Sequence, residues 1–174
     1  SPITHSLQLG AKDLLLVEGI HGMNDRITAE VPEQLTFGVY VSALGCINLD
    51  DHNRIRTTDV RLLRRIVRDN QFRGTLPAET LAMWPSVRRG EEKWIFPYQE
   101  NADVIFNSST LYELAVLKKH IFPLLVAVEP DDEYYEEVRA IVKVLNFVHS
   151  ADVDDEIPPT SLVREFIGGN TFYK

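Results

Sequence analysis

Residues 50–74, DDHNRIRTTDVRLLRRIVRDNQFRG, carry seven of the twelve arginines in this chain. Four of them are spaced as i, i+3, i+4 and i+7, which places their side chains on one face of an α-helix. They are Arg61, Arg64, Arg65 and Arg68. The intervening apolar residues form the opposite stripe; they are Leu62, Leu63, Ile66 and Val67. The pattern therefore predicts a helix that packs on one side and presents positive charge on the other.

The positive face of this helix calls for an anionic partner. Like charges at helical spacing repel by roughly 0.2–0.5 kcal/mol per pair, and a guanidinium presents a planar fork of donors that fits the oxygens of phosphate or carboxylate. The alternative is a solvated face that acids within the stretch, such as Asp59 and Asp69, neutralise. Thr57 or Thr58 is expected to cap the helix, and Gly74 to end it.

Composition favours a small ligand over a nucleic acid. The 174 residues carry a net charge of −8, so the positive field of the arginine stretch is local. No apolar run approaches the roughly 20 residues of a membrane span, and residues 1–10 lack the charged start and apolar core of a secretory signal, so a cytoplasmic protein is expected. The lone Cys46 has no partner for a disulfide or a zinc site. We expect one domain over residues 1–150, followed by a linker and a short helical tail over residues 151–174.

Residues 13–20, DLLLVEGI, are predicted to form a buried strand, because the apolar run is continuous and short. Glu18 lies at its carboxyl end, where ligands bind in open parallel sheets. The alternative is that Glu18 pairs with a neighbouring arginine. His21 follows in a loop, where histidines are more often surface residues than catalysts.

The remaining pattern alternates strands with helices and predicts an α/β layer fold. Strands are expected at residues 35–42 and 102–106. Helices are expected at residues 78–98 with a kink or break at Pro85 and Gly90, at 111–126 with a break near Pro123, at 132–148 and at 161–167. Three strands are too few for the usual doubly wound sheet.

Three stretches, in their order and spacing, resemble the phosphoribulokinase/uridine kinase family. They are VEGIHG at 17–22, NLDDHNRIRTTDVRLLRRIVRDNQFRG at 48–74 and ADVIFN at 102–107. Residues 84–107 and 157–169 also resemble the uridine-kinase-like domains that some bacterial proteins carry after segments related to threonyl-tRNA synthetase, so the resemblance covers almost the whole chain. It implies an ATP- and Mg²⁺-dependent kinase that phosphorylates a uridine-like nucleoside or a related sugar. The implied fold is the C-terminal part of a P-loop kinase-type parallel sheet with flanking helices and an arginine-rich helical lid.

The resemblance also implies roles for individual residues. Glu18 matches a catalytic acid that helps to position Mg²⁺ and its water, which makes it an indirect metal ligand. Arg61 matches an arginine that reaches the ribose hydroxyls, and His21 is assigned with it to substrate binding. Four arginines match lid positions that approach the phosphates: Arg64, Arg65, Arg68 and Arg73. Of these, Arg65 and Arg68 are expected to act in catalysis by neutralising charge on the transferred oxygens.

Two expected parts of such a kinase are missing from the 174 residues. One is the sequence GxxxxGK followed by Ser or Thr, the loop that holds the phosphates of ATP. The other is the aspartate that acts as the general base, for which no residue is a candidate. Both are expected before Ser1, so we interpret the chain as an inactive C-terminal piece of a kinase domain. A truncated sheet edge would favour self-association. A non-catalytic regulatory domain and a nucleic-acid-binding module that uses the arginine helix remain as alternatives.

Overall fold

The structure is a computed structural model that describes residues 6–45, 48, 50–52 and 54–172. Its sheet has two parallel strands, β1 (Val39–Ser42) and β2 (Val104–Asn107), with Val39 opposite Val104 and Ser42 opposite Asn107. Parallel strands need a long crossover, which usually contains helix. Here it contains α2 (Thr57–Arg73), α3 (Pro77–Trp94) and η2 (Phe96–Asn101). The predicted α/β arrangement and both of these predicted strands are confirmed, although β1 is shorter than expected.

The arginine helix forms as predicted. Its apolar stripe is buried, with Ile66 fully inaccessible to solvent. Gly74 ends the helix in the left-handed conformation at φ 66°, which glycine adopts without strain. The prediction of a threonine cap is wrong, because α2 begins at Thr57 and the carboxylate of Asp59 reaches back instead to the backbone N–H of Arg56 at 3.4 Å.

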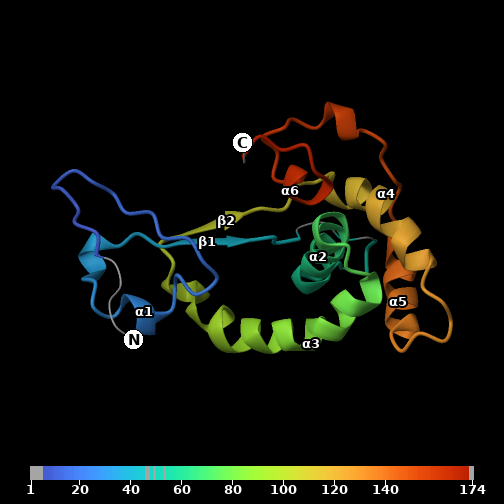
Figure 1. The fold of residues 1–174 in the computed structure, drawn as a ribbon, viewed down its shortest axis with the longest axis horizontal. Helices are drawn as coiled ribbons and strands as arrows, with labels where there is room; N and C mark the ends of the chain where they lie inside the picture. Colours follow the sequence, from blue (N-terminus) through green and yellow to red (C-terminus); the bar gives the residue numbers. More distant parts are fainter. Residues whose placement is uncertain (1–5, 46–47, 49, 53, 173–174) are drawn as a thin grey trace.

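The main core surrounds α2. It also includes apolar side chains from α4 (Glu113–Val126), α5 (Tyr135–Leu145) and α6 (Arg164–Ile167). Figure 1 shows α2 beyond the carboxyl ends of the two strands, with α3 below it, α6 above it and α4 and α5 on its far side. The helix expected to be a lid is therefore the centre of the core in this structure.

The helix breaks predicted at prolines are absent, because α3 continues through Pro85 and Gly90 and α4 continues through Pro123. The kink that was the alternative to a break at Pro85 and Gly90 stays a prediction. Proline removes one backbone hydrogen bond and crowds the preceding turn. Both prolines lie on exposed positions of their helices, where water can solvate the freed carbonyl while packing holds the opposite face.

The strand predicted at residues 13–20 is also wrong. This segment is irregular, and its side chains are exposed, with Leu14 at 91% and Leu16 at 87%. A strand needs a neighbour for its backbone hydrogen bonds, and β1 and β2 pair only with each other among the described residues. Short elements follow the segment, namely α1 (Asp25–Thr28) and η1 (Glu33–Leu35), before β1 begins.

The C-terminal segment, residues 157–169, follows η3 (Asp154–Glu156) and contains α6. Gly168 and Gly169 end it with φ of 84° and 73°. The expected short helix at residues 161–167 is therefore present in shortened form. Among the described residues, no helix is both long and apolar enough to cross a membrane.

Candidate functional site

A hollow of about 320 Å³ lies beyond the carboxyl ends of the two parallel strands. We call it the arginine pocket, because all four arginines predicted to share one helix face line it: Arg61, Arg64, Arg65 and Arg68. Val41 and Ser42 of β1 and Ser108, directly after β2, form its sheet side. Its other walls come from α3 and the C-terminal segment. This is the edge at which parallel α/β sheets bind ligands.

Arg61 joins the pocket to α3. Its Nη2 lies 2.7 Å from Oε1 of Glu91, a buried residue near the end of α3. Arg88 meets the other oxygen of the same carboxylate at 3.0 Å. One buried carboxylate therefore serves two guanidiniums, and Arg61 keeps donors that can face a ligand in the pocket.

Asp69 is shared by three arginines of α2. Its carboxylate is buried and lies 3.1 Å from Arg65, 3.7 Å from Arg68 and 2.9 Å from Arg73. The buried Nε atoms of Arg65 and Arg68 face Asp69 as ion pairs but form no hydrogen bond in the described part of the chain. Three positive groups around a single negative one leave an excess of positive charge next to the pocket, which favours an anion there.

Arg64 is held differently from its neighbours. Its guanidinium forms a two-pronged ion pair with the carboxylate of Glu113, which is 1% exposed, and it also donates to the Ser108 carbonyl at 2.8 Å and hydroxyl at 3.1 Å. With its donors used in this way, Arg64 stabilises the wall of the pocket. A direct contact with phosphate would require it to release a buried carboxylate, which is unfavourable.

The sequence model of one family, phosphoribulokinase / uridine kinase, matches residues 5–115. That range is more than half of the chain and includes all four arginines of the pocket. The chain belongs to this family. The comparisons with curated proteins and with solved structures found no match. The match to the family ends within α4, so it is narrower than the resemblance seen in the sequence and leaves α5 and the C-terminal segment outside it.

The structure does not bring Glu18 and His21 to the arginine pocket. Both lie in the exposed N-terminal part of the chain and neither lines the hollow. Figure 1 shows this part, drawn in blue, at the opposite end of the strands from α2. Arg73 also stays outside the pocket, where it is largely exposed and pairs with Asp69. The family roles expected for these residues therefore stay predictions.

Mg²⁺ and ATP are the cofactors that this family implies. Among the described residues, no group of three or more His, Cys, Asp or Glu side chains is placed to hold a metal ion. Mg²⁺ in kinases is often held by one or two carboxylates together with the substrate phosphates. The indirect role of Glu18 stays a prediction, because Glu18 does not line the arginine pocket. The guanidiniums of Arg65 and Arg68, which line the arginine pocket, fit phosphate oxygens.

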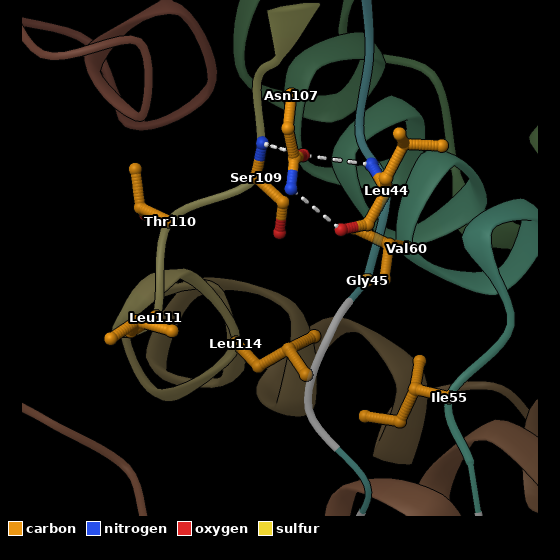
Figure 2. Close-up of a pocket in the computed structure, with 9 residues that line it drawn as sticks. All are labelled: Leu44, Gly45, Ile55, Val60, Asn107, Ser109, Thr110, Leu111 and Leu114. Carbon is orange, nitrogen blue, oxygen red and sulfur yellow. Dashed lines mark hydrogen bonds between the residues drawn. The ribbon is translucent and has the colours of Figure 1, made fainter.

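A second, smaller hollow of about 80 Å³ adjoins the ends of the strands. Figure 2 shows how the Asn107 side chain bridges its rim: its carbonyl oxygen accepts from the Leu44 and Ser109 backbone N–H groups, and its amide donates to the Leu44 carbonyl, each at 3.0 Å. The hollow is mostly apolar and much smaller than typical ligand pockets of about 300–1,000 Å³. We therefore read it as a packing defect beside a structural latch.

Several residues of the site were not predicted from the sequence. They are Glu91, Ser108, Glu113 and Phe166. The polar residues directly after the β2 strand could have been noticed, because a strand's carboxyl end is where ligand contacts gather. Nothing local marks Glu91, Glu113 or Phe166, which reach the arginines only through tertiary packing.

Proposed function

We propose that this chain is part of an ATP-dependent kinase that phosphorylates a hydroxyl group of a uridine-like nucleoside or a related sugar. The observation that carries the proposal is the position of the arginines. In a member of the phosphoribulokinase/uridine kinase family, four guanidiniums line one hollow at the carboxyl ends of parallel strands, and the ion pairs of one of them, Arg68, are too long for hydrogen bonds.

The arginines support this reaction through charge and position. Phosphoryl transfer spreads negative charge over the transferred oxygens, and fixed donors stabilise that charge without reorganisation. Arg65 and Arg68 are the donors best placed for phosphate oxygens. Arg61, on the same face but closer to the start of α2, is assigned to the hydroxyls of the acceptor, as the family resemblance implies.

The proposal for Glu18 and His21 rests on the family resemblance alone. Glu18 would help to position Mg²⁺, and His21 would contact the substrate. Both would act only if the N-terminal segment reaches the carboxyl ends of the strands, an arrangement different from the one described here. The bound ATP and Mg²⁺ would supply the transferable phosphoryl group and its charge neutralisation.

We also propose that the 174-residue chain alone does not turn over substrate. It lacks the sequence GxxxxGK followed by Ser or Thr, whose backbone N–H groups and lysine hold the phosphates in kinases of this type. The kinase would be the longer protein in which this loop and a general-base aspartate are present.

The experiment compares the 174-residue chain with a version extended to include the expected phosphate-binding loop. Each is incubated with Mg-ATP and a panel of nucleosides and sugars, and acceptor-dependent ADP release is measured. Only the extended protein should turn over. Arg68→Gln should lower its kcat by about 10²-fold, the typical effect of losing one donor to the transition state. Arg89→Gln, an exposed arginine on α3 outside the pocket, should leave the rate unchanged.

An extended protein that binds ATP but releases ADP with none of the acceptors would overturn the proposal. The nucleic-acid alternative gains no support from the geometry. The arginines are gathered in a hollow and paired with buried carboxylates, whereas nonspecific nucleic-acid binders present exposed basic surfaces.

A further inference from the structure

The C-terminal segment, residues 157–169, lies outside the family match, yet it is built onto the arginine helix. Val163, Phe166 and Ile167 are buried in the main core. The side-chain amide of Gln71 donates to the Ile167 carbonyl at 2.9 Å. A Cβ at Gly168 would approach that amide to 2.6 Å, and the backbone there has a φ of 84°, so this contact depends on glycine. The segment is therefore a fixed part of the fold.

Three residues of this segment line the arginine pocket: Leu162, Glu165 and Phe166. The Phe166 ring centre lies 4.9 Å from the guanidinium carbon of Arg64, a distance at which an aromatic ring attracts a cation. Since Arg64 is also fixed by its buried ion pair, Phe166 forms a rigid wall. Glu165 differs from it, because its side chain is half exposed.

Arg68 has the least complete set of partners among the four arginines that line the pocket. Its Nε is 3.7 Å from Asp69 Oδ1 and its Nη1 is 3.6 Å from Glu165 Oε1, both too long for a hydrogen bond. The other three arginines each meet a carboxylate at 3.1 Å or less. An incoming anion therefore gains most at Arg68.

We propose that Glu165 is an internal competitor for the phosphate group that the arginine pocket binds. This inference rests on the proposed function in assigning the pocket to phosphate. The Glu165 carboxylate faces Arg68 without a hydrogen bond, so it can turn toward solvent at little cost. A phosphate oxygen that reaches Arg68 takes its place, and one negative group exchanges for another. Glu165 thus sets how strongly the pocket holds phosphate.

The test is a double-mutant cycle on the 174-residue chain, read by isothermal titration with inorganic phosphate at constant ionic strength. Glu165→Gln should bind phosphate about two- to fivefold more tightly than the parent, because exposed ion pairs are weak. The gain should vanish when Arg68→Gln is also present, since the cycle isolates the pairwise effect. Glu156→Gln, an exposed acid of the preceding η3 turn that does not line the pocket, should match the parent.

Equal affinity of the parent and Glu165→Gln overturns the inference, and so does a gain that persists with Arg68→Gln. Glu165 is half exposed, so its replacement by Gln should leave the fold intact, and urea denaturation checks that its stability is kept. The result is also separate from catalysis. Kinase activity in the extended protein without tighter binding by Glu165→Gln overturns this inference alone. Tighter binding without kinase activity in the extended protein overturns the proposed function alone.

Discussion

The helical region around α2 and the N-terminal region before β1 both contain runs of apolar residues. These residues are buried in the first region and exposed in the second. Leu62, Leu63, Ile66 and Val67 of α2 are buried among α4, α5 and α6. The equally apolar run Leu14–Val17 is exposed at the other end of the sheet (Figure 1). Hydrophobicity alone does not make a core. A helix satisfies its own backbone and needs only side-chain partners, whereas a strand also needs a neighbouring backbone.

This difference indicates that most of the stability of the folded chain comes from the region around α2. The region around α2 combines a continuous apolar core with buried ion pairs. The sheet has two short strands, with Val39, Val41, Ile105 and Phe106 exposed, and two strands alone are marginal. We therefore expect substitutions around α2 to matter greatly and substitutions in the N-terminal run to matter little.

Glu113→Gln should have the largest effect. The change leaves the Arg64 guanidinium without its buried counter-charge, and breaking a buried pair in this way costs about 3–5 kcal/mol. Urea unfolding of the parent and the variant measures the loss. Glu92→Gln, whose carboxylate pairs with Arg88 but is exposed, is the matched control and should change stability by less than about 0.5 kcal/mol. Similar small losses for both variants would refute the structural role given to Arg64.

Ile66→Ala compared with Leu16→Ala tests the contrast between the two regions directly. Ile66 is fully buried, so its truncation should lower the free energy of unfolding by about 2–5 kcal/mol through lost burial and a residual cavity. Leu16 is almost fully exposed, so its truncation should change stability by less than about 0.5 kcal/mol. A large loss for Leu16→Ala would mean that the N-terminal run is packed in solution.

The same contrast explains what could be predicted from sequence. The 3.6-residue period, the arginine spacing and Gly74 predicted α2 and its pocket-lining face, because these signals are local. The strand prediction for residues 13–20 was wrong, because a buried strand depends on neighbouring strands that a local sequence pattern does not contain. The partners of the arginines could not be predicted for the same reason. Glu113 lies 49 residues from Arg64 along the chain, and Phe166 lies further still.

Asn107→Ala should have a moderate effect confined to the sheet. The substitution removes the latch that joins the carboxyl ends of β1 and β2 through Leu44 and Ser109. Water can reach these groups, so the loss should be about 1 kcal/mol. Hydrogen exchange should speed up at the Leu44 and Ser109 amides. Asn101→Ala loses one exposed hydrogen bond to Asp25 and should leave that exchange unchanged. Equal protection of these amides in both variants would show that Asn107 does not hold the strand ends together.

The smallest effect should be pH-dependent and should involve Asp154 in η3. Burial acts to raise the pKa of Asp154, but the hydrogen bond from Lys119 and the charges of His120 and Lys119 outweigh it, so the pKa lies below its ordinary value. A depressed pKa means that the charged carboxylate stabilises the folded state above the unfolded pKa of about 4. This contribution, below about 1 kcal/mol for such a pair, is lost as pH falls through the lowered folded pKa.

The measurement is urea unfolding of the parent and Asp154→Asn between pH 6 and pH 2. The stability difference should be largest at pH 6 and should shrink in the acid range. Asp155→Asn, an exposed neighbour, is the control and should show no such convergence. A difference that stays constant across this range would assign the effect of Asp154→Asn to packing instead of charge.

Thermal unfolding of the 174-residue chain in rising inorganic phosphate tests whether the arginine pocket binds phosphate. Chloride at equal ionic strength provides the reference. A ligand at ten times its Kd stabilises the folded state by about 1.4 kcal/mol, so the parent and Arg89→Gln should both melt at higher temperature in phosphate. Arg68→Gln should lose most of that shift. If Arg68→Gln responds to phosphate as the parent does, the pocket is not the anion site and the account is contradicted.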